Sequence, residues 1–152
     1  MTKIRIAVAG AGYIGQAHMA MALSSSYFEL CAIVDPSPSG VDVAARAGVP
    51  LYASIDELLS RNRPDGLILA TPNPLHVPQA LQCIAAGLPI LLEKPIATTV
   101  AEGRQLVDEV ENTGAKVLIG HHRAHSPIMA KAREVIDSGK LGRLVAVMGS
   151  AT

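Results

Sequence analysis

The stretch Gly10-Ala11-Gly12-Tyr13-Ile14-Gly15 decides the fold, because it sets three glycines between two segments of different periodicity. The apolar run before it, residues 4–9, is rich in β-branched residues and predicts a strand. Residues 13–24 carry apolar side chains at three- and four-residue spacing and predict a helix. Glycines in this context permit a tight turn, close approach of the backbone to a pyrophosphate and close packing of the helix on the sheet. The stretch therefore predicts a dinucleotide-binding turn.

Asp35 is the acid that such a turn requires downstream. It lies 20 residues after Gly15, at the end of a second apolar run over residues 29–34. From that position a carboxylate accepts hydrogen bonds from both hydroxyls of the adenosine ribose. It favours NAD over NADP, because a 2′-phosphate would meet a like charge and Pro36-Ser37-Pro38 offers no arginine. The alternative is a plain turn in which Asp35 only caps a loop, and it accounts less well for the combined spacing.

The composition agrees with a binder that uses backbone groups. The 152 residues hold 13 basic and 13 acidic side chains, so the formal net charge is zero and no nucleic-acid partner is indicated. Unpaired N–H groups at the N-terminus of the predicted helix, around Tyr13 and Ile14, can hold a pyrophosphate without a basic side chain. We expect a small substrate that is neutral or weakly charged.

Strands and helices are expected to alternate along the rest of the chain. Strands are predicted at residues 4–9, 29–34, 66–70, 89–92 and 116–119, and helices at residues 13–24, 54–60, 74–86, 98–112 and 126–138. Thr99 and Glu102 have the spacing of a capping box, and Gly87 and Gly114 follow helices as C-terminal stops. Most of the strands are too apolar to have a solvated face. The pattern predicts an α/β fold, a doubly wound Rossmann domain with a mostly parallel sheet and helices on both faces.

The two ends of the chain indicate its domain organisation. We expect residues 1–122 to form the nucleotide-binding domain and residues 123–152 to supply a last helix and a strand that lead into a missing C-terminal substrate domain. That strand is expected over residues 143–152, and residues 36–40 are expected to be flexible. The chain begins without a signal region, and no apolar run approaches the roughly 18 residues of a membrane span, so we expect a cytoplasmic protein with no membrane partner.

Two further polar segments follow predicted strands, at the edge where open α/β sheets bind ligands. Thr71-Pro72-Asn73, together with His76, follows the third predicted strand and is a candidate cofactor contact. Glu93 and Lys94 follow the fourth predicted strand and are candidates for the same role. Ordinary turn chemistry is the alternative for the first segment. A surface ion pair beside a turn proline is the alternative for the second.

Lys94 is the candidate catalytic residue. A lysine that is desolvated beside a bound nicotinamide can give a proton or a hydrogen bond to the substrate oxygen. Pro95 keeps Lys94 out of the helical region and is compatible with a cis peptide bond.

His121, His122 and Arg123 follow the last predicted strand and are candidates for the substrate site. With His125 they place three histidines in five positions, which invites a metal interpretation. No carboxylate or cysteine stands among them, so we predict no metal site. His18, in the first helix, is interpreted as a packed helix residue. Cys31 and Cys83 lie 52 residues apart in the sequence and predict neither a redox pair nor a zinc site.

In their order along the chain, these segments resemble the glucose-fructose oxidoreductase and inositol dehydrogenase family, often written Gfo/Idh/MocA. The resemblance spans nearly the whole chain and rests on the glycine turn, Asp35, Thr71-Pro72-Asn73 with His76, Glu93-Lys94-Pro95 and Gly120-His121-His122-Arg123. It implies an NAD(P)-dependent dehydrogenase of the CH–OH group, acting on a sugar, cyclitol or related polyol, with Lys94 as the catalytic lysine. In this family the histidine-rich segment often continues with arginine and an aromatic residue, whereas here Ala124 and His125 follow Arg123.

The resemblance also implies parts that lie beyond Thr152. An aspartate and a histidine on a later helix assist the lysine, and a second domain supplies the substrate site and the contacts of a homo-oligomer. We therefore expect this chain to bind NAD and to turn nothing over by itself. Two alternatives stay open: a regulatory Rossmann module that senses NAD without chemistry, and a reductase of amino-acid biosynthesis with a similar nucleotide domain.

Overall fold

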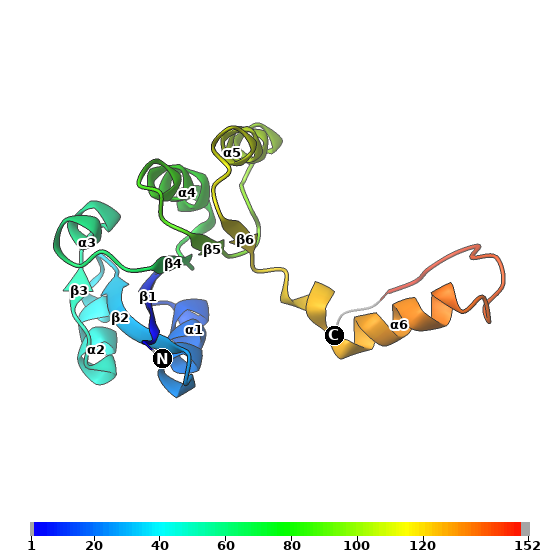
Figure 1. The fold of residues 1–152 in the computed structure, drawn as a ribbon, viewed down its shortest axis with the longest axis horizontal. Helices are drawn as coiled ribbons and strands as arrows, with labels where there is room; N and C mark the ends of the chain where they lie inside the picture. The colour runs from blue at the N-terminus through cyan, green and yellow to red at the C-terminus, as the bar shows by residue number, and fades with distance from the viewer. Residues whose placement is uncertain (1, 150–152) are drawn as a thin grey trace. The chain divides into compact units, whose positions relative to one another are not determined.

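The computed structural model describes residues 2–149, in two compact units that divide after Gly120. A parallel sheet of six strands forms the first unit (Figure 1). The strands are β1 (Ile4–Ala9), β2 (Phe28–Val34), β3 (Leu51–Tyr52), β4 (Gly66–Leu69), β5 (Ile90–Leu92) and β6 (Val117–Ile119). They lie in the order β3-β2-β1-β4-β5-β6, and every neighbouring pair is parallel. The direction of winding therefore reverses between β1 and β4, which leaves a crevice at the carboxyl ends of these strands.

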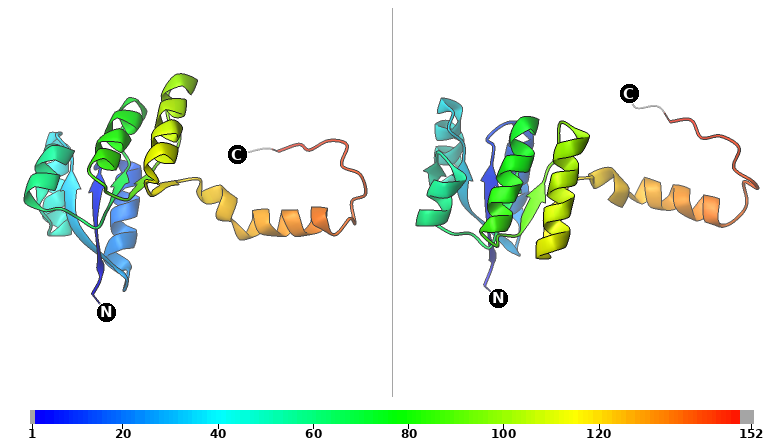
Figure 2. Two further views of the ribbon diagram at one scale, coloured as in Figure 1. Left: turned by 45° about the horizontal axis from the view of Figure 1, so that its top comes forward. Right: turned by 90° about the horizontal axis from the view of Figure 1, so that it is seen from above.

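Helices cover both faces of this sheet (Figures 1 and 2). They are α1 (Tyr13–Ser24), α2 (Pro38–Ala47), α3 (Ile55–Arg61), α4 (His76–Ala85) and α5 (Val100–Thr113), with the 3₁₀ turn η1 (Asn73–Leu75) ahead of α4. Helices α1 and α2 pack around a core that includes Val8 and Ile33. Helices α3, α4 and α5 pack on the opposite face around Ala7 and Ala9. Successive residues of β1 thus belong to different cores, and the predicted Rossmann fold is confirmed.

The predicted helix signals are also confirmed. The Thr99 side chain accepts a hydrogen bond from the Glu102 N–H at 3.2 Å, and the Glu102 carboxylate accepts one from the Thr99 N–H at 3.0 Å, which completes the capping box. Gly87 and Gly114 adopt positive φ angles of 64° and 68° after their helices. Left-handed backbone is the usual end of a helix and favours glycine, because a side chain there is strained.

Two elements of the first unit were not predicted. Within residues 36–40, expected to be flexible, α2 instead begins at Pro38, with Ser37 at the N-cap. Proline suits that position, since its missing N–H has no partner inside a helix in any case. Strand β3 has only two residues, paired with Ile33 and Val34 of β2, and is too short to show an alternating pattern.

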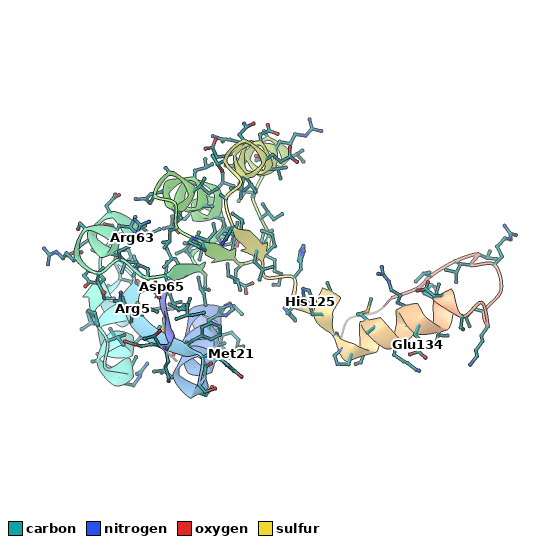
Figure 3. All side chains as sticks on the ribbon, viewed as in Figure 1. Arg5, Met21, Arg63, Asp65, His125 and Glu134 are labelled. Carbon is teal, nitrogen blue, oxygen red and sulfur yellow. The ribbon has the colours of Figure 1, made fainter. Side chains whose placement is uncertain are left out.

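The second unit contains the turn η2 (His122–His125) and helix α6 (Pro127–Asp137), which confirms the predicted helix at 126–138. Glu134 of α6 pairs with Lys131 at 2.7 Å, and both side chains are exposed (Figure 3). The strand expected at residues 143–152 is not observed over 143–149, and residues 150–152 lie outside the described residues. A strand exists through hydrogen bonds to a neighbour, and the structure gives residues 143–149 no neighbouring strand. None of the helices within residues 2–149 is long and apolar enough to cross a membrane.

We expect Gly15→Ala to destabilise the fold strongly. A Cβ at Gly15 would lie 1.8 Å from the carbonyl oxygen of Gly10, so the helix and the turn must separate. The expected loss in the free energy of unfolding is about 3 kcal/mol or more, measured by urea denaturation. Gly12→Ala is the matched control, because a Cβ there meets nothing within 4 Å. It should lose no more than about 1 kcal/mol, the effect of a less favourable N-cap residue. Similar losses in both variants would contradict this account.

Candidate functional site

The glycine turn joins three strands at the carboxyl edge of the sheet. The Gly10 N–H donates a hydrogen bond to the Val34 carbonyl oxygen at 2.8 Å, which ties the turn to the end of β2. Gly10 has a φ of 95°, and a Cβ there would lie 2.4 Å from the carbonyl oxygen of Ala70, just after β4. Only glycine permits this backbone angle together with this close approach. The turn is therefore held between the ends of β2 and β4, at the switch point of the sheet.

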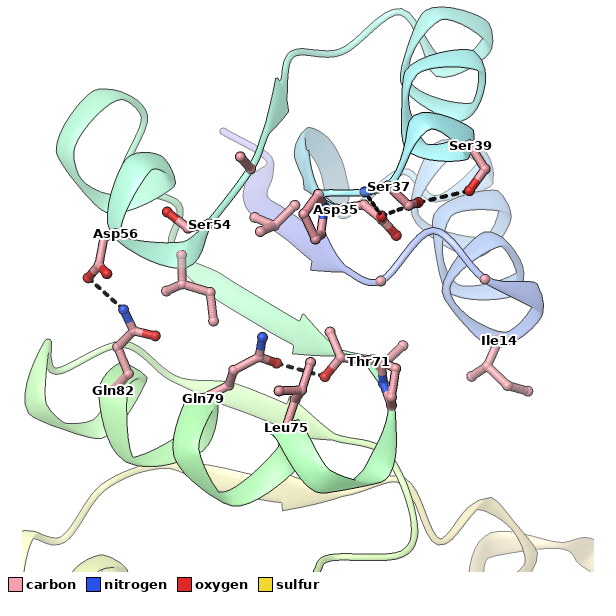
Figure 4. A pocket seen from close by; sticks show the side chains of 18 of the residues that line it. Ile14, Asp35, Ser37, Ser39, Ser54, Asp56, Thr71, Leu75, Gln79 and Gln82 are labelled. Carbon is pink, nitrogen blue, oxygen red and sulfur yellow. Dashed lines mark hydrogen bonds between the residues drawn. The ribbon is translucent and has the colours of Figure 1, made fainter.

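A cavity of about 660 Å³ opens at this edge (Figure 4). Seven of the predicted site residues line it: Gly10, Gly12, Tyr13, Ile14, Asp35, Thr71 and Pro72. Residues that the sequence did not single out complete the polar part of the wall, and Figure 4 shows them around the opening: Ser37, Ser39, Ser54, Asp56, Gln79 and Gln82. The cavity thus gathers loops that follow β1, β2, β3 and β4 into one site.

Asp35 is fixed in this cavity by backbone and hydroxyl donors. One carboxylate oxygen accepts the Ala11 N–H at 2.7 Å. The other accepts the Ser37 N–H at 2.8 Å and the Ser37 hydroxyl, whose oxygen is also 2.9 Å from that of Ser39. Partial burial raises the pKa of the Asp35 carboxyl, but the hydrogen bonds from Ser37 and Ala11 outweigh it and hold this pKa below its ordinary value of 3.8. Asp35 is thus a carboxylate near neutral pH.

The start of α1 offers a cradle for an anion. Gly12 is the N-cap residue and has no side chain to cap the helix. Within the described residues, the N–H groups of Tyr13 and Ile14 donate to no protein acceptor. Because a Cβ at Gly12 would point into open space, the backbone there can be approached closely from the cavity. Unpaired N–H groups beside the positive end of a helix suit a pyrophosphate, and a carboxylate at the end of β2 suits a ribose diol. The residues present therefore fit a dinucleotide.

The segment after β4 lies only partly in the wall of the cavity. The Thr71 hydroxyl donates to the Gln79 side-chain oxygen at 2.7 Å in the wall of the cavity, while Asn73 begins η1 and does not line the cavity. His76, expected to contact the cofactor, is 1% exposed and also lies outside the cavity wall. Its ring nitrogens lie 2.7 Å from the Pro95 carbonyl oxygen and 2.9 Å from that of Thr71. The buried His76 ring thus links two turns, and a direct contact with the cofactor stays a prediction.

Glu93 and Lys94 lie at the carboxyl edge of β5, outside the cavity wall. Glu93 is paired with His18 of α1, with 2.9 Å between Oε1 and Nε2. Burial raises the pKa of the Glu93 carboxyl, but the hydrogen bond from His18 and the N–H of Lys94 hold it below its ordinary value. Lys94 is exposed, and in the described part of the chain no carboxylate forms an ion pair with it. The Lys94–Pro95 peptide bond is cis.

The remaining candidates belong to the second unit. His121, His122 and Arg123 lie at the start of that unit, on or beside η2. Among residues 2–149, no group of three histidine, cysteine or acidic side chains is arranged to hold a metal ion. Cys31 and Cys83 are buried free thiols, as expected for core residues. The substrate role of the histidine segment stays a prediction.

Sequence reasoning missed the His18–Glu93 pair and the polar wall of the cavity. His18 was interpreted as a packed helix residue, because nothing in the spacing of α1 indicates a partner 75 positions later. Gln82 donates to Asp56 at 2.5 Å across the gap between α4 and α3, a contact between separate helices (Figure 4). Ser54, which accepts the Glu57 N–H as the N-cap of α3, lies at the start of a predicted helix, and only the fold shows that it lines the cavity.

A family model described as an oxidoreductase family with an NAD-binding Rossmann fold matches residues 4–121. The chain belongs to this family, Gfo/Idh/MocA. It is 35% identical over 147 residues to the rhizopine catabolism protein MocA of Rhizobium meliloti, covering 97% of this chain and 46% of that protein. It is 27% identical over 151 residues to inositol 2-dehydrogenase of Rubrobacter xylanophilus, covering 97% of this chain and 43% of that protein.

Solved structures of the family share the fold. The WlbA dehydrogenase from Bordetella pertussis, in complex with NADH and UDP-GlcNAcA, matches with a TM-score of 0.86 and 28% identity, over 93% of this chain and 41% of that one. This chain spans less than half the length of the relatives it matches. The family and its NAD-binding Rossmann fold, both predicted from the sequence, are confirmed.

Acid should weaken the fold partly through Asp35. A carboxyl whose pKa is lower in the folded state stabilises the protein above its unfolded pKa, and this contribution is lost as the pH falls through the folded value. For Asp35, whose ordinary pKa is 3.8, we expect the contribution to be complete above about pH 5 and to be lost as the pH falls through the lower pKa of the folded state. In Asp35→Asn, the free energy of unfolding should therefore decrease less steeply as the pH is lowered. Urea denaturation from pH 6 to pH 2.5 measures this dependence. Asp42→Asn, at an exposed position of α2, is the control. The same pH dependence of the unfolding free energy in both variants would refute the stabilising role given to Asp35.

Proposed function

We propose that the protein carrying this chain is an NAD-dependent dehydrogenase of the CH–OH group, which moves a hydride between nicotinamide and a secondary alcohol of a sugar, cyclitol or related polyol. One observation carries the proposal: the Asp35 carboxylate and the unpaired N–H groups of α1 meet in one cavity at the switch point of the sheet. The substrate class is supported by relatives named inositol 2-dehydrogenase and by WlbA, which is solved with a nucleotide sugar acid.

In this proposal, different residues of the chain bind different parts of NAD. Asp35 accepts the adenosine ribose hydroxyls, and its charge opposes a 2′-phosphate. The N–H groups of Tyr13 and Ile14 bind the pyrophosphate, and Gly12 leaves the backbone open to it. Thr71 and Pro72 line the cavity on the β4 side. When bound, NAD supplies the hydride acceptor for alcohol oxidation.

Lys94 manages the proton of the substrate hydroxyl in this proposal. It lies at the carboxyl edge of β5, next to β4 in the sheet, and its ammonium group is not engaged by a carboxylate within the described residues. A lysine in that position can hold the hydroxyl by a hydrogen bond and accept its proton once deprotonated. His121, His122 and Arg123 contribute to the substrate site, and the rest of the protein supplies further catalytic groups and the contacts of a homo-oligomer. The chain by itself binds NAD without turnover.

Asp35→Ala should change the choice of cofactor. Loss of the carboxylate removes the acceptor of the ribose hydroxyls and the charge that repels a 2′-phosphate, so NAD should bind about tenfold more weakly, with NADP affinity kept or improved. Isothermal titration of this chain with NAD and NADP measures both values. Asp42→Ala, on the exposed side of α2, should leave both unchanged. If the unaltered chain preferred NADP, the role given to Asp35 would be wrong.

Lys94→Ala should separate a dehydrogenase from an NAD sensor. In the full-length protein we expect turnover to fall by at least about 1,000-fold while NAD affinity changes less than about threefold, because the lysine acts on the substrate proton. A sensor has no turnover to lose. NADH formation with a panel of polyols, followed at pH 8, gives the rates, and calorimetry gives the affinities. Polyol oxidation by residues 1–152 alone would contradict the inactivity proposed for this part.

A further inference from the structure

Two histidines hold the residues on either side of Lys94. His18 belongs to α1, which begins at the glycine turn, and its ring contacts the side chain of Glu93. His76 is the first residue of α4, and its ring contacts the backbone carbonyl of Pro95. Neither ring lines the cavity. Each histidine therefore joins a helix that begins beside the cofactor site to an immediate neighbour of the lysine.

The first of these links is a partly buried contact between the side chains of His18 and Glu93. The His18 and Glu93 side chains are 18% and 14% exposed, and 2.9 Å separates their nitrogen and oxygen. The second carboxylate oxygen of Glu93 accepts the Lys94 N–H at 3.2 Å. A Cβ at Gly120, just after β6, would lie 2.8 Å from Glu93 Oε1, so the carboxylate occupies space that any other residue at position 120 would take. Glu93 is thus held by contacts with His18, the Lys94 N–H and Gly120, and it does not line the cavity.

The second link is fully buried. His76 is 1% exposed, and both of its ring nitrogens face carbonyl oxygens, those of Pro95 at 2.7 Å and Thr71 at 2.9 Å. Carbonyl oxygens only accept hydrogen bonds, so the ring is the donor in its contacts with these two turns. The ring connects the turn after β4 with the turn after β5. A shift of the Lys94 turn away from Thr71 would leave a buried polar group without a partner, which is costly.

The strand order indicates which half of a bound dinucleotide lies beside these two histidine contacts. Asp35 follows β2, on one side of β1, and defines the adenosine side of the crevice. The pyrophosphate lies at the start of α1, so the other half of the molecule extends past β4 toward β5. Thr71 and Lys94 follow β4 and β5 in that direction. The Lys94 turn therefore belongs to the nicotinamide side.

We propose that His18 and His76 are positioning residues that hold the Lys94 turn against the nicotinamide half of the bound cofactor. This inference rests on the proposed function. His18 acts through Glu93, and His76 acts through the backbone of Pro95. Helices α1 and α4 begin at the two turns that contact the cofactor in the proposed function. The backbone that binds the pyrophosphate therefore also sets the position of Lys94.

The test compares NAD⁺ with ADP-ribose, which lacks the nicotinamide. In His18→Leu, calorimetry on the full chain should show NAD⁺ binding weakened about three- to tenfold, the effect of one lost hydrogen bond, with ADP-ribose affinity within about twofold of the unaltered chain. His18→Gln keeps an N–H donor for Glu93 and should recover most of the NAD⁺ affinity. A variant that merely loosens the fold would weaken both ligands equally.

Two controls keep the comparison specific. Met21→Ala changes an exposed side chain of the same helix, 68% exposed, and should alter neither affinity. Glu93→Gln combined with His18→Leu should weaken NAD⁺ binding no more than the stronger single variant, because both changes remove one contact. His76→Gln is measured after thermal unfolding has shown a cooperative transition, and the His18 series carries the test by itself if that variant does not fold.

The outcomes separate this proposal from the one on which it depends. Equal weakening of NAD⁺ and ADP-ribose in His18→Leu, or no recovery in His18→Gln, would overturn the positioning role while leaving NAD binding intact. Failure of the unaltered chain to bind both NAD⁺ and ADP-ribose would overturn the proposed function, and the positioning role with it.

Discussion

The approach of Gly15 to the carbonyl oxygen of Gly10 is the constraint on which the rest of the structure depends. The space that a Cβ of Gly15 would fill is already taken by that oxygen, so α1 starts directly against the end of β1. The positive φ of Gly10 then turns the chain between the ends of β2 and β4, where a Cβ would lie 2.4 Å from the Ala70 carbonyl oxygen. Close packing of backbone on backbone places the first N–H groups of α1 at the cavity, where the N-cap Gly12 has no side chain.

The same turn connects the two sides of the site. On the β2 side, the Ala11 N–H is donated to the Asp35 carboxylate, so the acid is placed relative to the turn by a hydrogen bond. On the β5 side, His18 extends from α1 to Glu93. The start of α1 therefore helps to set the distance between Asp35, on the adenosine side, and the turn that carries Lys94. This matters because a dinucleotide has a defined length, and a displacement of about 1 Å at a reacting group costs a large factor in rate.

Buried polar side chains in this domain link elements of the fold, and each has its partners. No buried side-chain nitrogen or oxygen within the described residues lacks a hydrogen bond. The two ring nitrogens of His76 lie within hydrogen-bond distance of the Pro95 and Thr71 carbonyl oxygens, in the turns after β5 and β4. The partly buried Asn62 donates to the Cys31 carbonyl oxygen at 3.1 Å. In a core this apolar, an unpartnered polar group costs free energy, and these groups therefore specify one arrangement of the strand ends.

The sequence by itself determined the features that local patterns encode. The glycine turn, the acid after the second strand, the capping box at Thr99 and the alternation of strands and helices all follow from backbone sterics and periodicity, and they indicated the Rossmann fold and the NAD site. The tertiary structure alone decided which side chains meet. His18 and Glu93 lie 75 positions apart, and the burial of His76 depends on a turn 19 positions later. Such partners depend on strand order and helix packing, which bring distant segments to one sheet edge, and no local pattern in a single sequence records that convergence.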